Sequence, residues 1–216
     1  MSEPASRIVP DTEEERTLAR KVIDGGGLLA FLTDTFYGLG ADPFNIKAVE
    51  RINRLKEREG RKAVLVVISA REVADRFITE KTALFEEITE HYWPGPLTIV
   101  CKARPDVPEG ITAGSGTIGL RLPGDEKVRE FIHACGGALT ATSANLAGEP
   151  PARTALEVAR YFPDELDLIV DGGESKTDRP STVIDVSHGG VRIIREGEVT
   201  RSELRRTLCA LGHEVE

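Results

Sequence analysis

The chain has 216 residues, of which 40% are hydrophobic and 30% charged, and 28 Lys and Arg against 36 Asp and Glu give a net charge of −8. At about 150 residues per domain this length predicts one or two domains, large enough to bury a core without disulfides. The composition excludes a disordered chain. The acidic balance argues against a nucleic-acid-binding coat over the whole surface, although a local basic patch remains possible.

The cysteines and the N-terminus indicate the compartment. Cys101, Cys135 and Cys209 have no zinc or CxxC spacing, and an odd number suits a reducing cytosol better than a disulfide framework. The acidic N-terminal segment has no apolar core, and no apolar run approaches the roughly 20 residues that span a bilayer. We expect a cytoplasmic protein with no membrane partner. The four histidines show no paired-ligand spacing, so we predict no metal held by the protein itself.

Helical and strand-like patterns alternate along the chain. A helix capped by Asp11 or Thr12 ends at the glycines 25–27, and a later helix has Ala48, Ile52 and Leu55 on one face. The last helix is expected to be capped by Ser202. Further helices are predicted around 84–88, over 128–135 and over 156–161, and strands over 28–32, 63–68, 97–101, 118–122, 139–141 and 168–171, with a hairpin of 181–186 and 191–195. This order predicts an α/β fold: one domain, 1–216, with a mixed sheet, no linker and no additional C-terminal domain.

A glycine-rich segment over 114–119 matches the G-x-G-x-x-G pattern of dinucleotide-binding sites. That site needs a strand before the glycines and a helix after them, so that the phosphate lies at the helix N-terminus. Here a loop precedes the glycines and a strand is expected to follow. We therefore reject a Rossmann site.

Basic residues are concentrated in the segment 51–62, which contains six Lys or Arg and two Glu. They could be solvated residues near a helix C-terminus, where cations are favoured. They could also bind phosphate, since Lys supplies a point charge and Arg a fork of donors. Composition alone leaves both interpretations open.

Polar residues also follow several predicted strands. The segments 33–38 (TDTFYG) and 142–145 (TSAN) could be ordinary turns, or could bind a ligand at a crevice beside the sheet. Arg121 and Arg195 could face solvent or point into a cleft. The sequence has no P-loop and no G-x-S-x-G elbow. This set of residues suits binding and orienting anionic reactants better than covalent catalysis.

Taken together, seven segments resemble the YrdC-like family, whose members include the L-threonylcarbamoyladenylate synthases. They are TDTFYGLG (33–40), KER (56–58), WPGPLT (93–98), RLP (121–123), TSAN (142–145) with STVID (181–185), and REG (195–197). They occur in the family's order and cover about residues 12–200. The resemblance implies a twisted mixed sheet flanked by helices around a deep basic cavity.

The resemblance further implies an activity. L-threonine, bicarbonate and ATP, accompanied by Mg²⁺, would give threonylcarbamoyl-AMP and pyrophosphate, for N6-threonylcarbamoylation of adenosine 37 in tRNA. An RNA-binding module that uses the basic cavity without adenylation is the alternative. A related enzyme acting on carbamoyl phosphate is a further alternative, although such enzymes usually belong to longer chains with zinc-finger-like cysteines.

The family's functional residues carry over by motif. Lys56 and Arg58 would be catalytic and would bind the ATP phosphates. The other nucleotide-binding positions are Lys62, Thr117, Ser143, Asn145 and Arg195, and the threonine-binding positions are Thr35, Arg121, Ala141 and Ser181. We expect Lys56→Ala or Arg58→Ala to abolish activity with little loss of stability, on the assumption that both cations are exposed.

The sequence departs from the family pattern in places. Leu32 and two positions after the KER motif, Glu59 and Ala63, stand where proline is usual. Val67 stands where many members have a histidine used for threonine. The departure at Val67 weakens the assignment of the amino acid rather than that of the class of reaction.

Overall fold

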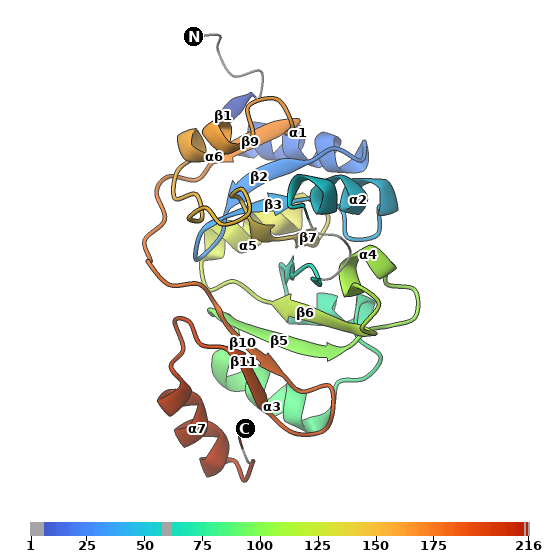
Figure 1. Ribbon diagram of the computed structural model, residues 1–216, viewed down its shortest axis with the longest axis vertical. Helices are drawn as coiled ribbons and strands as arrows, with labels where there is room; N and C mark the ends of the chain where they lie inside the picture. Colours follow the sequence, from blue (N-terminus) through green and yellow to red (C-terminus); the bar gives the residue numbers. More distant parts are fainter. Residues whose placement is uncertain (1–6, 58–61, 214, 216) are drawn as a thin grey trace.

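The computed structural model describes residues 7–57, 62–213 and 215 (Figure 1). The strands divide into two mixed sheets, one in the upper and one in the lower part of Figure 1, with helices packed around both. Strand β1 lies near one end of the molecule and helix α7 near the other. Within the described residues, no helix is both long and apolar enough to cross a membrane.

The first sheet combines parallel and antiparallel pairs. Strand β9 runs parallel to both β1 and β2, whereas β3 runs antiparallel to β2 and to β8. Its order is β1 (Ile8–Pro10), β9 (Leu168–Asp171), β2 (Leu29–Leu32), β3 (Tyr37–Gly40) and β8 (Thr142–Ser143).

The second sheet is also mixed. Strands β10 and β5 are parallel, as are β4 and β6, and the remaining neighbours are antiparallel. Its order is β11 (Arg192–Arg195), β10 (Thr182–Asp185), β5 (Leu97–Lys102), β6 (Thr117–Arg121), β4 (Val66–Ile68) and β7 (Ala138–Thr140).

Most of the helices begin at polar caps. Thr12, Asn45, Thr82 and Asp125 each accept a hydrogen bond from a backbone N–H in the first turn of the helix that follows. The helices are α1 (Glu13–Asp24), α2 (Ile46–Leu55), α3 (Ala83–Tyr92), α4 (Glu109–Thr112), α5 (Glu126–Ala134), α6 (Ala155–Tyr161) and α7 (Arg201–Ala210), with a 3₁₀ helix η1 (Arg71–Arg76).

One hydrophobic cluster joins the two sheets. Phe31 of the first sheet stacks on Phe131 of α5 with ring centroids 5.3 Å apart, and Val67 and Leu139 of the second sheet belong to the same cluster. Each of these side chains is at most 2% exposed. Burying a phenylalanine stabilises a fold by about 1.5–3 kcal/mol, so this cluster fixes one sheet relative to the other.

The predicted α/β class is confirmed, and most predicted elements are present, but some details are corrected. The strands form two mixed sheets instead of one. The strand expected over 63–68 is only Val66–Ile68, and residues 63–65 before it line a cavity. The last helix is capped by Thr200, whose side chain accepts from the Glu203 N–H, and Ser202 lies inside the helix.

Two short segments carry the chain from one sheet to the other. Ala141 alone separates β7 of the second sheet from β8 of the first. The segment 172–181 connects β9 of the first sheet to β10 of the second. Residues from both crossings line the cavity described next.

Candidate active site

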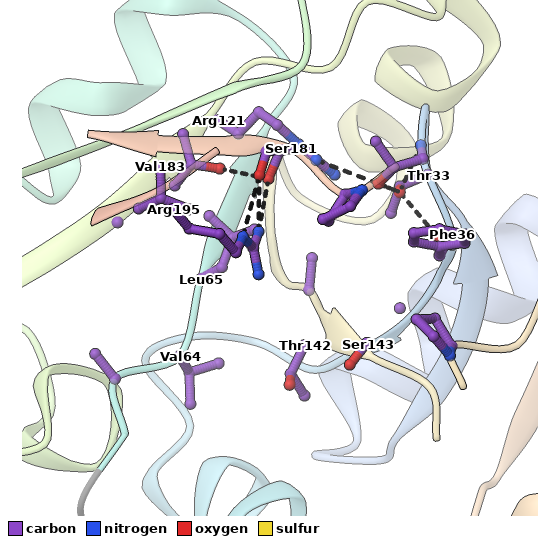
Figure 2. Close-up of a pocket in the computed structure, with 18 of the residues that line it drawn as sticks. Thr33, Phe36, Val64, Leu65, Arg121, Thr142, Ser143, Ser181, Val183 and Arg195 are labelled. Atoms are coloured by element: carbon purple, nitrogen blue, oxygen red, sulfur yellow. Dashed lines mark hydrogen bonds between the residues drawn. The ribbon is translucent and has the colours of Figure 1, made fainter. Parts of the chain in front are cut away.

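A cavity of about 580 Å³ is lined by residues of both sheets (Figure 2). The first sheet contributes residues of β3 and β8, and the second contributes residues of β5, β6, β10 and β11. Figure 2 shows Arg121, Ser181 and Arg195 along one side and Thr142 and Ser143 along the opposite side. Cavities of about 300–1,000 Å³ that combine apolar walls with a few polar groups are typical of small-molecule sites.

All four residues predicted to bind threonine line this cavity. Arg121 is 2% exposed at the end of β6, and its Nη1 donates to Thr35 Oγ1 over 3.3 Å. Ser181 is buried, and its hydroxyl is 3.0 Å from that of Thr98. The backbone N–H of Ala141 already donates to the Leu65 carbonyl at 2.8 Å, so that donor is not available to a ligand.

A second arginine reaches the same cavity from β11. The Nη2 of Arg195 donates to the Ser181 carbonyl at 2.9 Å and to the Ser181 hydroxyl at 3.3 Å (Figure 2). Partial burial, and secondly the positive charge of Arg121, lower the pKa of Arg195. Two guanidinium groups therefore converge where an anionic ligand would relieve their repulsion.

Three of the predicted nucleotide-binding residues line the cavity: Thr117, Ser143 and Arg195. The Thr117 hydroxyl is 2.8 Å from that of Ser115, in the turn before β6. Ser143 Oγ donates to Asn145 Oδ1 at 2.7 Å, so Asn145 supports Ser143 without lining the cavity itself.

Lys56 is placed differently from the prediction. It is 8% exposed, and its ammonium donates to the Ser143 carbonyl at 2.9 Å, to Asn145 Oδ1 at 2.6 Å and to the Asn145 carbonyl. The assumption that Lys56 is an exposed cation is therefore wrong, because α2 ends beside the 143–145 turn and directs the side chain into it. Lys56 lies behind the cavity wall and fixes the turn that carries Ser143.

Two other members of the basic segment lie outside the cavity lining. Arg51 pairs with Asp167 at 3.2 Å, and Lys62 is exposed and is not part of the cavity lining. Arg58 lies outside the described residues, so its predicted role stays a prediction.

The glycine-rich segment over 114–119 is followed by strand β6, as predicted, and not by a helix. Gly114 and Gly116 have φ angles of 74° and 69°, which glycine adopts readily. The segment is a turn that starts a strand, and only its final part, Thr117 and Gly119, reaches the cavity.

Sequence reasoning did not identify several lining residues. Val64, Leu65, Asp178 and Ile194 line the cavity without having been predicted. Ile194 could have been found, because the consecutive Ile193 and Ile194 break the alternation of β11 and place one isoleucine, 53% exposed, on the open face. Asp178 lies in the polar crossing segment, where no pattern indicates which side chain faces a cavity.

Comparisons with known proteins identify the family of the chain. The sequence pattern of the Sua5/YciO/YrdC family, described as "Telomere recombination", matches residues 21–197. The chain belongs to the Sua5/YciO/YrdC family. This membership agrees with the resemblance that the seven sequence motifs indicate.

The members of the Sua5/YciO/YrdC family that resemble this chain share most of its length. A threonylcarbamoyl-AMP synthase of Marinobacter nauticus is 38% identical over 175 residues, covering 80% of this chain and 91% of the relative. One of Pyrococcus abyssi is 33% identical over 191 residues, covering 88% of this chain but 56% of the relative, so the chain spans little more than half of that protein. The crystal structure of P. abyssi Sua5 complexed with L-threonine superimposes with a TM-score of 0.89 at 30% identity, over 98% of this chain and 62% of that one.

Proposed function

We propose that this chain is a threonylcarbamoyl-AMP synthase, which converts L-threonine, bicarbonate and ATP to threonylcarbamoyl-AMP and pyrophosphate. One observation carries the proposal: the cavity between the sheets gathers seven residues predicted from family motifs, in a chain that is 30% identical to a Sua5 solved with L-threonine. The names of the relatives favour this function over an RNA-binding module. The product would serve N6-threonylcarbamoylation of adenosine 37 in tRNA, in the cytoplasm, where ATP and tRNA occur.

The amino acid fits the side of the cavity formed by Arg121 and Ser181. A guanidinium presents parallel N–H donors that match the two oxygens of a carboxylate. Because Arg121 is buried, a carboxylate bound there would be desolvated and held in one orientation. The nucleotide would occupy the region of Thr117, Ser143 and Arg195.

The reaction needs no nucleophile from the protein. The threonine amine attacks CO₂ derived from bicarbonate and loses a proton, which forms the carbamate C–N bond. A carbamate oxygen then attacks the α-phosphorus of ATP, and the bond to the β-phosphate bridging oxygen breaks as pyrophosphate leaves. The residues of the cavity would supply alignment and positive charge for this displacement.

Magnesium would enter as part of the MgATP substrate. Among the described residues, no group of three or more His, Cys, Asp or Glu side chains could hold a metal, and Asp178 is the one acidic residue lining the described cavity. Mg²⁺ commonly takes one or two carboxylates together with phosphate oxygens and water. The residues present suit an ion held mainly by the triphosphate, whose negative charge it would neutralise.

An omission assay tests the proposal. Purified protein should release pyrophosphate from MgATP only when L-threonine and bicarbonate are both present, because the carbamate must form before the α-phosphorus is attacked. Release that persists without threonine would indicate another acceptor. RNA affinity that falls with salt, without any pyrophosphate release, would favour the RNA-binding alternative.

A further inference from the structure

A buried ion pair separates the active-site cavity from a second cavity. Arg121 Nη2 lies 3.1 Å from Asp34 Oδ1, and the two side chains are 3% and 8% exposed. Arg121 lines the active-site cavity, whereas Asp34 lines a second cavity of about 620 Å³. Thr33 lines both cavities. The wall between them therefore has the guanidinium of Arg121 on the side of the active-site cavity and the carboxylate of Asp34 on the side of the second cavity.

Asp34 is held in place by both sheets. It follows β2 of the first sheet, and its Oδ2 accepts from the Gly124 N–H at 3.0 Å, just beyond β6 of the second. The turn that contains Asp34 is itself fixed, because Thr33 Oγ1 accepts from the Thr35 N–H at 3.1 Å and donates to the Phe36 carbonyl at 2.7 Å. The carboxylate therefore has one defined position relative to the end of β6.

These contacts leave part of the guanidinium available. Arg121 donates a hydrogen bond from Nη1 to Thr35, whereas its contact with Asp34 is an ion pair, and within the described part of the chain neither Arg121 Nε nor Asp34 Oδ1 has a hydrogen-bond partner. A guanidinium has five N–H donors, so donors remain for an anion in the cavity. A charge this deeply buried needs a counter-ion even before a ligand arrives, and Asp34 provides one from outside the active-site cavity.

We propose that Asp34 is a positioning residue, which holds the Arg121 guanidinium oriented to receive the carboxylate of the amino-acid substrate. This role rests on the proposed function and adds to it a residue that does not touch the substrate. Thr35, which also contacts Arg121, lines the active-site cavity and can contact the ligand itself, whereas Asp34 acts only through Arg121.

The test replaces Asp34 with asparagine, which retains the shape and an oxygen acceptor for Gly124 but removes the charge. Titration calorimetry would measure the affinities for L-threonine and for MgATP separately. We expect the dissociation constant for threonine to rise about tenfold, within the range of coupling between residues of one ion-pair network, and that for MgATP to change less than twofold. The exposed Glu174, which also lines the second cavity, provides a matched control, and Glu174→Gln should leave both constants unchanged.

A double-mutant cycle separates positioning from a general loss of structure. Arg121→Met should weaken threonine binding, and adding Asp34→Asn to it should cause no further loss, because Asp34 then has no guanidinium to hold. Additive losses would overturn the proposal. If Asp34→Asn does not fold, Asp34→Glu keeps the charge and moves it by one methylene. It should then weaken threonine binding while leaving MgATP binding intact, and an unchanged threonine affinity would overturn the proposal.

Threonine binding by the unaltered protein distinguishes a failure of the role proposed for Asp34 from a failure of the proposed function. If the unaltered protein does not bind L-threonine, the proposed function is contradicted and the positioning role with it. If the unaltered protein binds L-threonine and Asp34→Asn binds it equally well, only the role of Asp34 is contradicted.

Discussion

Lys56 shows how one buried cation supports the site indirectly. Its ammonium contacts oxygens of Ser143 and Asn145, which follow Lys56 by about ninety residues in the chain. Those contacts join the end of α2 to the end of β8 and the turn after it, and Ser143 of β8 lines the cavity. The side chain therefore contributes to stability as well as to the charge near the site.

This placement predicts a loss of stability in Lys56→Ala. Removing the ammonium takes a donor from partly buried oxygens of Ser143 and Asn145, which costs about 1–3 kcal/mol in the free energy of unfolding. Urea denaturation would measure this loss in the free energy of unfolding. The exposed Lys62 of the same basic segment is the control, and Lys62→Ala should change stability by less than about 0.5 kcal/mol. Equal unfolding midpoints for the two variants would contradict a structural role for Lys56.

The sequence could indicate which individual residues carry charge or hydroxyl groups, but not which distant residues pair. The motifs placed Thr35, Arg121, Ser181 and Arg195 at the site, and all four line the cavity. The pairing of Arg121 with Asp34 could not be predicted, because 87 positions separate them and their contact depends on how the two sheets pack.

The helices and strands were predicted well where the local sequence determines them. Helix α1 begins at Thr12, as the polar residue before an apolar-periodic segment indicates, and the hairpin of β10 and β11 forms as predicted. Strand β3 was missed because two of its four residues are glycine, which is depleted in strands. A Cβ at Gly40 would lie 2.8 Å from Leu29 Cδ1, so close packing against β2 explains that glycine.

Ser202 was predicted to cap α7, but the N-cap is Thr200, two residues earlier. Thr200 and Glu203 have the S/T-x-x-E spacing of a capping box, a signal that favours Thr200 over Ser202. The structure agrees, because the Thr200 side chain accepts from the Glu203 N–H at 3.2 Å.

This cap gives a prediction with a matched pair of variants. Thr200→Ala should lower stability by about 1 kcal/mol, because it leaves a first-turn N–H of α7 without its acceptor. For a chain of this size that corresponds to a Tm lower by about 2–4 °C in calorimetry. Ser202→Ala should shift the Tm by less, since among the described residues its hydroxyl contacts the hydroxyl of Thr200 and does not cap the helix. A larger shift in Ser202→Ala would contradict the assignment of the cap.

At the scale of the whole molecule, the proposed function depends on the space between the two sheets. The fold class was predictable from alternating helix and strand patterns, but the division into two sheets was not, because short strands do not show in the sequence which neighbours they pair with. The cavity depends on that division, since its walls come from both sheets and from the segments that cross between them. Residues far apart in the chain therefore meet at a single site.

The central claim is that this cavity joins threonine, a one-carbon unit and an adenylate. Mass spectrometry of the product formed from ¹³C-bicarbonate, L-threonine and MgATP tests it most directly. We predict an adenylate whose mass contains threonine and one ¹³C, formed by the unaltered protein and lost in Arg121→Met. An adenylate that lacks either the label or threonine, or an undiminished product in Arg121→Met, would contradict the claim.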